Sequence, residues 1–185
     1  MPSVNIEKAY KETMVKKMRE TLNLPNVFMA PKIEKVVINI GVGKMRQQPQ
    51  FDEKILPEIT KSLSLISGQK PALTRAKKSI AGFKVREGDV VGLKTTLRGK
   101  RMYDFLDRLV NAALPRVRDF RGISQNSLDA KGNLTIGVKE HTVFPEIDSE
   151  VSHFAFGLEI SVVVRARKRE DAIELYKLMR IPLKI

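Results

Sequence analysis

The sequence predicts an α+β fold: a mostly antiparallel sheet with helices packed on one face and the other face open. Three observations support this fold class. First, 185 residues that are 42% hydrophobic and 30% charged favour one globular domain over residues 1–185. Second, segments with two-residue apolar alternation and segments with a helical period follow one another in mixed order. Third, two alternating segments place polar and cationic side chains opposite their apolar face.

The first helix is expected over residues 5–22, where apolar side chains recur at every fourth position. A loop over residues 24–31 then leads to a strand over residues 33–43. The apolar face of this strand carries Val36, Ile38 and Ile40, and its polar face carries Lys35 and Asn39. We expect the apolar face to be buried and the polar face to be free.

The second helix is expected over residues 52–67, with Gly68 as the residue that ends it. Pro57 lies in its first turn if the helix starts near Leu56, and otherwise kinks it. A short strand over residues 69–74 follows. A second alternation runs from residue 85 to residue 98 and turns at residues 87–89. Its apolar side carries Leu93 and Leu97, and its polar side carries Lys94, Thr96 and Arg98.

The rest of the chain predicts a helix over residues 100–114 that Pro115 closes, and strands over residues 134–138 and 158–164. A last helix includes residues 172–179. No internal repeat or low-complexity linker marks a domain boundary.

The net charge of +13 indicates an anionic partner, for which nucleic acid comes first and an acidic membrane second. No apolar run approaches the ~20 residues of a spanning helix, and the first twelve residues do not resemble a secretory signal. With no cysteine and two histidines, the chain offers neither disulfides nor a zinc enzyme's ligands. We therefore expect no membrane partner and no cofactor.

Six cations and no acid lie between residues 70 and 86, and Gly82 is expected to act as a hinge in this basic segment. Cations together with amide and hydroxyl groups suit phosphates and 2′-hydroxyl groups of RNA. A polar strand face is equally typical of a surface that only meets solvent. Phe83 and Phe120 either stack on unpaired bases or pack as core or hinge residues.

Two motifs resemble catalytic or nucleotide-binding elements but do not support them. GVGK at residues 41–44 lacks the spacing of a phosphate-binding loop, and PEID at residues 145–148 has no acid-base partner nearby. From the residues alone, the chain is expected to be an RNA-binding α+β domain and not an enzyme.

Five ordered stretches resemble a known family. They are KVVINIGVG at 35–43, SGQKPALTRAKKSIAGFKVREG at 67–88, GLKTTLRGKRMYDFLDRL at 92–109, LPRVRDFRG at 114–122 and VFPEID at 143–148. Together they are similar to the bacterial-type form of the fifth large-subunit ribosomal protein, a universal family that binds 5S ribosomal RNA (rRNA). The resemblance extends over nearly the whole chain.

This resemblance implies a structural protein of the large ribosomal subunit, in the cytoplasm, that binds 5S rRNA in the central protuberance. Its other implied partners are further large-subunit rRNA, other central-protuberance proteins and a small-subunit head protein at an inter-subunit bridge, for which residues 110–145 are the expected side. The implied rRNA-binding residues are Asn39, Gln69, Phe83 and Thr96, next to which the alternation places Lys94 and Arg98. The loop with Arg75, Lys77, Lys78 and Ser79 is implied to reach transfer RNA in the peptidyl site (P-site tRNA).

Two other functions are compatible with the same basic sheet. One is an RNA-remodelling or RNA-processing factor, and the other is a free particle that stores 5S rRNA. The segment RARKRED at residues 165–171 departs from the family pattern, which usually has an acidic or hydroxyl-rich turn there.

Overall fold

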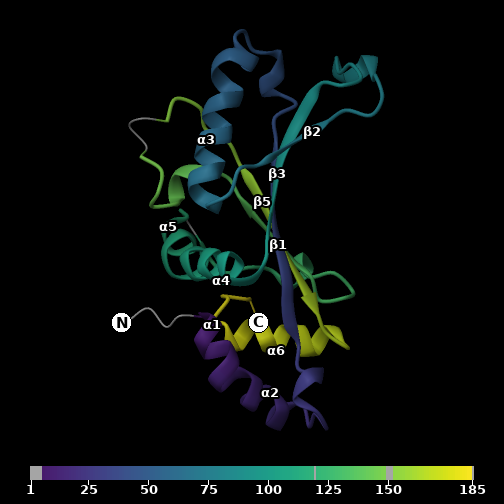
Figure 1. Ribbon diagram of the computed structural model, residues 1–185, viewed down its shortest axis with the longest axis vertical. Coiled ribbons are helices and arrows are strands. Elements are labelled where there is room, and N and C mark those ends of the chain that lie inside the picture. Colours follow the sequence, from purple (N-terminus) through teal and green to yellow (C-terminus); the bar gives the residue numbers. More distant parts are fainter. Residues whose placement is uncertain (1–5, 119, 149–151, 185) are drawn as a thin grey trace. The chain divides into compact units, whose positions relative to one another are not determined.

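The computed structural model describes residues 6–118, 120–148 and 152–184 (Figure 1). The chain forms two compact units, which are described one at a time. Unit 1 consists of Met1–Val37, Leu97–Ile136 and Ile160–Ile185, and unit 2 consists of Ile38–Thr96 and Gly137–Glu159. The expectation of one domain over residues 1–185 stays a prediction.

A five-stranded sheet has the order β2-β3-β1-β5-β4. The strands are β1 (Lys32–Gly41), β2 (Ala72–Arg75), β3 (Val90–Leu97), β4 (Leu134–Val138) and β5 (Leu158–Arg165). β2 and β3 are antiparallel, with Ala72 opposite Lys94 and Leu73 opposite Leu93. The predicted α+β class with an antiparallel sheet is confirmed.

Unit 1 contains three predicted helices, two of which are interrupted by a wider π-helical turn. The first consists of α1 (Ile6–Ala9), η1 (Tyr10–Met14) and α2 (Val15–Thr21), and the second of α4 (Gly99–Arg108), η6 (Leu109–Ala113) and α5 (Leu114–Arg116). The third is α6 (Arg169–Leu178). Pro115 lies in the last turn of the second helix, directly after the π-helical turn η6, and the helix continues to Arg116 instead of ending before Pro115.

The core of unit 1 combines aromatic and aliphatic side chains from its helices and strands. Its fully buried members include Val36, Phe105, Leu106, Leu134, Val162, Leu175 and Tyr176. Two short 3-10 helices, η2 (Val27–Met29) and η7 (Gln125–Ser127), lie in its connections. Burial of this apolar area, at roughly 25 cal/mol per Å², supplies the main driving force for folding of the unit.

In unit 2, a π-helical turn η4 (Phe51–Ile55) leads into α3 (Leu56–Ser67). Pro57 lies in the first turn of α3, which is one of the two alternatives expected for it, and Gly68 ends the helix in the left-handed conformation, as predicted. Three further 3-10 turns, η3 (Met45–Gln47), η5 (Ala81–Phe83) and η8 (His141–Val143), complete the unit. Its core includes Ile38, Ile40, Ile59, Leu63, Ile66 and Leu93.

Gly92 lets two backbones of unit 2 approach each other closely. A Cβ atom at this position would lie 2.8 Å from the carbonyl oxygen of Ile40, and Val42 N donates to Val91 O at 3.0 Å. The end of β1 and the start of β3 therefore meet at a distance that only glycine allows. Within the described residues, no helix has both the length and the apolarity to cross a membrane.

Candidate nucleic-acid interface

One side of β1 and β3 is polar and accessible in unit 2. Asn39 is exposed between the fully buried Ile38 and Ile40. On β3, Lys94 is exposed and Thr96 is half-buried, whereas the intervening Thr95 is buried at 2% exposure. We call Asn39, Lys94 and Thr96 the open strand face. It offers an amide, an ammonium group and a hydroxyl group, which can bind phosphates and 2′-hydroxyl groups.

Gln69 precedes β2, and its backbone is fixed by a neighbouring hydroxyl group. Ser67 Oγ accepts from Gln69 N at 3.3 Å and lies 2.9 Å from Gln69 O. The side-chain amide of Gln69 forms no hydrogen bond with another described residue. It is therefore available to a ligand on the surface of unit 2.

Arg98 and Lys35 belong to unit 1 and are described apart from the open strand face. Arg98 is exposed, and its Nη1 donates to Glu34 O at 3.5 Å. This long bond leaves most of the donors of the guanidinium group free.

The basic segment forms the loop between β2 and β3, which Figure 1 shows at the end of these two neighbouring strands. Backbone bonds close it at its base, where Ala76 N donates to Asp89 O at 2.8 Å and Gly88 N donates to Ala76 O at 3.0 Å. Ile80 and Val85 form an isolated antiparallel bridge nearer the tip. The loop is therefore a folded hairpin extension with its own hydrogen bonds.

An acid of this chain contributes to the loop, although none lies within the basic segment. Asp89 accepts a hydrogen bond from Arg86 N and forms an ion pair with Arg46. Arg46 also donates from Nη1 to Lys84 O at 3.3 Å. These bonds hold both sides of the loop together and neutralise Arg46, while Lys77 and Lys78 remain exposed.

Two of the four predicted tRNA-contact residues have partners inside the loop. Arg75 Nη1 donates to Gly88 O at 2.8 Å, and Ser79 Oγ accepts from Glu87 N at 2.9 Å. Both residues are exposed, but these bonds give them a part in shaping the loop. Lys77 and Lys78 have no such bond within the described residues.

Gly82 does not act as the hinge that the sequence suggested. It lies in η5 without a positive φ, and a Cβ atom there would meet nothing within 4 Å. Two other residues of the loop are left-handed, Lys84 with a φ of 51° and Gly88 with a φ of 87°. Gly88 lies in the turn predicted at residues 87–89, whereas Lys84 adopts this conformation at a cost of about 1 kcal/mol.

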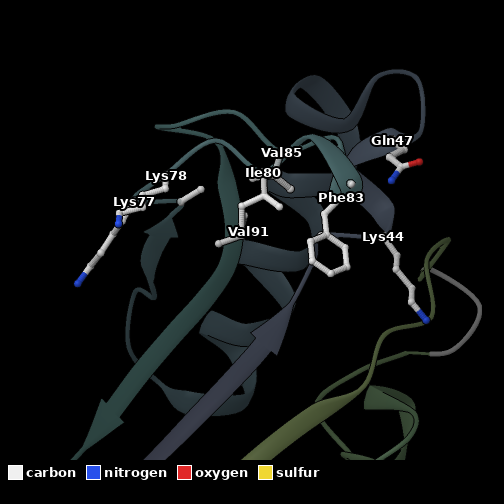
Figure 2. Close-up of a pocket in the computed structure, with 11 residues that line it drawn as sticks. Lys44, Gln47, Lys77, Lys78, Ile80, Phe83, Val85 and Val91 are labelled. Atoms are coloured by element: carbon white, nitrogen blue, oxygen red, sulfur yellow. The ribbon is translucent and has the colours of Figure 1, made fainter.

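An apolar pocket of about 810 Å³ lies between the β2–β3 loop and the residues that follow β1 (Figure 2). It is lined by Gly43, Lys44, Gln47, Ala76, Lys77, Lys78, Ile80, Gly82, Phe83, Val85 and Val91. Phe83 is 71% exposed and Ile80 is 50% exposed, so neither belongs to the core. In Figure 2 the ring of Phe83 lies between Ile80 and Lys44, with its face accessible. An exposed aromatic ring with cations beside it can stack on an unpaired base.

Sequence reasoning missed this pocket because its walls come from separate segments. Gly43, Lys44 and Gln47 follow β1, and the remaining residues come from the loop and β3. The sequence does place GVGK directly after β1, but no pattern there indicates that it faces Phe83. Phe120, the second candidate for stacking, is half-buried in unit 1.

His141 has the surroundings of a structural residue. Its ring is buried, stacks on Phe156 at 3.9 Å between ring centroids, and lies with Nε2 2.8 Å from Ser152 Oγ. Burial lowers the pKa of the imidazole, against the weaker opposing effect of Glu58. Among the described residues, no three His, Asp or Glu side chains are grouped so as to hold a metal ion.

The fold, the polar strand face and the basic loop together define an α+β protein of the nucleic-acid-binding class. Two family models match the chain. The model described as ribosomal protein L5 matches residues 26–86, and the model described as the C-terminus of the same ribosomal family matches residues 90–183. The chain therefore belongs to the ribosomal protein L5 family, which confirms the resemblance seen in its motifs.

Relatives with the name large ribosomal subunit protein uL5 cover nearly the whole chain. The protein of Syntrophomonas wolfei is 54% identical over 175 residues, which are 95% of this chain and 96% of that protein. The protein of Halothermothrix orenii is 47% identical over 94% of both chains. The protein of Dichelobacter nodosus is 46% identical over 97% of this chain and 98% of that protein.

Proposed function

We propose that this protein is a structural, non-catalytic component of the large ribosomal subunit in the cytoplasm. In this proposal it binds 5S rRNA in the central protuberance, beside other rRNA and proteins of that region. It touches P-site tRNA through the β2–β3 loop and contributes to an inter-subunit bridge with a small-subunit head protein. The names of its relatives and its basic charge support this function.

The observation that carries the 5S rRNA proposal is the contrast between neighbouring residues on β3. Thr95 is buried, whereas Thr96 reaches the same side as the exposed Lys94. Asn39 on β1 has the same exposed character. The open strand face therefore has polar side chains that form no hydrogen bond with another described residue, together with a cation for a phosphate.

Gln69 and Phe83 extend the proposed rRNA contact beyond the strands. The free amide of Gln69 can donate to and accept from a base edge or a sugar. Phe83 presents its ring to the pocket between the β2–β3 loop and the residues after β1, where an unpaired base can stack while Lys44 meets its phosphate. Arg98 supplies a further cation from unit 1.

In the loop, the proposed tRNA contacts divide into two roles. Lys77 and Lys78 are exposed and can meet phosphates without reading base sequence. Arg75 and Ser79 hold the loop in shape through Gly88 O and Glu87 N. A contact made to phosphates suits a loop that meets many different tRNAs.

Two isosteric substitutions on adjacent residues test the 5S rRNA proposal. Thr96→Val removes a hydroxyl group from the open strand face, so 5S rRNA affinity should fall by roughly 1–3 kcal/mol if its partner stays desolvated. Thr95→Val is the matched control, because Thr95 Oγ1 is buried without a hydrogen-bond partner among the described residues. It should leave affinity unchanged and raise the free energy of unfolding by about 1 kcal/mol. Filter binding and urea unfolding measure the two quantities.

The opposite pattern would contradict the proposal. If Thr95→Val weakened 5S rRNA binding and Thr96→Val did not, the RNA would lie on the other side of β3.

The rival function, an RNA-remodelling factor, is tested by sedimentation of a tagged copy from cell lysate. A structural component should migrate with large subunits, and a free pool that processes RNA would support the rival.

A further inference from the structure

The corner between β5 and α6 carries cations that the proposed function does not use. Lys131, Arg165, Arg167 and Lys168 are all exposed there, and we call them the corner patch. They line a pocket of about 320 Å³ in unit 1, with Glu34 as the one acid of its lining. Three of the four belong to RARKRED, the segment that departs from the family pattern.

A rigid turn holds Lys131 at this corner. The carboxylate of Asp129 accepts from Lys131 N and Asn133 N, both at 2.8 Å, and from Asn133 Nδ2 at 2.7 Å. Asn133 Oδ1 accepts from Val164 N at 3.1 Å, which ties the turn to β5. Tyr176 donates its buried hydroxyl to Gly132 O at 2.8 Å, which ties the turn to α6. The backbone on both sides of the pocket is therefore fixed before any ligand arrives.

Asp129, which holds the turn beside the corner patch, does not neutralise the patch. Asp129 is occupied by its own turn: desolvation acts to raise its pKa, but the hydrogen bonds from Asn133 and the backbone outweigh this and lower the pKa. The neighbouring base Arg169 is not counted in the corner patch, because its Nη2 donates to Gln125 O at 2.9 Å. Within the described part of the chain, none of the four patch side chains forms an ion pair. Four like charges on a fixed corner repel one another unless an anion lies between them.

We propose that the corner patch binds the phosphate backbone of an RNA strand, on a surface separate from the open strand face. The pocket can hold a phosphate group with its sugar, and the two guanidinium groups can each grip phosphate oxygens with two donors. An acidic protein segment fits less well, because protein interfaces centre on large apolar or aromatic anchors. The apolar lining of this pocket is limited to Ala130, Val164 and Ala166.

The test measures binding of a fluorescein-labelled RNA hairpin of mixed sequence, about 20 nucleotides long, to the full chain saturated with 5S rRNA. The variant Arg165→Gln/Arg167→Gln/Lys168→Gln removes three charges of the corner patch. Its affinity for the hairpin should fall roughly tenfold, and its log–log salt slope should lose about two to three units. The control Lys16→Gln/Lys54→Gln/Lys61→Gln removes three exposed charges elsewhere and should change affinity less than about threefold.

Equal losses in the two variants would overturn the proposal, since the effect would then reflect net charge alone. A polyglutamate peptide that binds the wild type and not the patch variant, while hairpin affinity is unchanged, would assign the corner patch to an acidic protein. The patch variant should also keep its affinity for 5S rRNA in a separate titration. A loss of 5S rRNA affinity would place the corner patch in the 5S rRNA interface, and the proposal of a separate surface would then be wrong. The single change Arg167→Gln, at an exposed position, gives the same comparison if the triple variant fails to fold.

Discussion

At Gly132 the backbone has a φ of +84°, and a Cβ atom would lie 2.4 Å from the Cβ of Ala172. Gly132→Ala therefore combines left-handed strain with a collision against α6. We expect the free energy of unfolding to fall by roughly 2–5 kcal/mol, measured by urea denaturation. Because the same turn carries Lys131, the substitution should also weaken RNA binding at the corner patch.

Gly68 provides the control for this prediction. It also has a positive φ, at +66°, but a Cβ atom there would meet nothing within 4 Å. Gly68→Ala should therefore cost only the backbone strain, about 1 kcal/mol. If both substitutions lowered the free energy of unfolding equally, the structure around Ala172 would accommodate the new Cβ atom at no cost, and the predicted collision would be wrong.

Because His141 is buried, we expect the free energy of unfolding to fall at acidic pH. Its burial lowers the pKa of the folded protein's imidazole, so the unfolded chain binds this proton first as the pH falls. The contribution of the neutral ring is complete above the unfolded pKa of about 6.5 and is lost as the pH falls from there towards the lowered folded value. Unfolding in urea between pH 7.5 and pH 5 should show this decline, and His141→Phe should flatten it. The same decline in His141→Phe would assign the effect to other groups.

At the scale of single elements, periodicity predicted which side of a strand is buried. The alternation in β1 and β3 places Asn39 and Thr96 on the accessible side, where the structure has them. The same reasoning could not find the pocket beside Phe83 or the bond from Arg75 to Gly88 O. These depend on contacts between segments, whereas periodicity reports only how one segment meets its surroundings.

Predictions from residue type alone were also wrong about part of the backbone conformation of the β2–β3 loop, and the reason is physical. A glycine hinge was expected at Gly82, but the backbone bonds between Ile80 and Val85 hold Lys84 in the left-handed conformation instead, while Gly88 is left-handed in the predicted turn at residues 87–89. The π-helical turns η1, η4 and η6 were not predicted either, because an apolar spacing of four residues fits both an α-helical turn and the wider π-helical turn. Tertiary hydrogen bonds outweigh local preferences of about 1 kcal/mol.

The β2–β3 loop predicts separate effects for its exposed and its bonded cations. Lys77→Ala/Lys78→Ala removes the two proposed phosphate contacts from a folded loop, so P-site tRNA should dissociate faster from reconstituted large subunits. Each contact is worth about 1 kcal/mol or less at such an exposed position. Affinity of the free protein for 5S rRNA should stay nearly unchanged.

Arg75→Ala is the comparison for this prediction, because it removes the bond to Gly88 O. We expect it to loosen the loop and to speed amide hydrogen exchange at Ala76 and Gly88, which Lys77→Ala/Lys78→Ala should not do. If the double lysine variant lost 5S rRNA binding and kept normal tRNA dissociation, the loop would belong to the 5S rRNA interface.

At the scale of the whole molecule, the +13 charge divides between distinct surfaces. Unit 2 carries the open strand face and the β2–β3 loop, and unit 1 carries the corner patch and Arg98. Two acids close to these surfaces, Asp89 and Asp129, are occupied by bonds inside the chain. The excess charge is therefore concentrated where the fold does not neutralise it.

This distribution predicts a steep salt dependence of 5S rRNA binding. If about six to eight phosphates are neutralised, the log–log slope of affinity against salt concentration should be about −4 to −7, because condensed counterions are released on binding. Titrations between roughly 50 and 300 mM salt measure it, and Lys94→Gln should make the slope less steep by about one unit. Thr96→Val should lower affinity at every salt concentration and leave the slope unchanged, since a hydroxyl group displaces no counterion. A nearly flat wild-type slope would mean that the positive charge acts on a partner other than 5S rRNA.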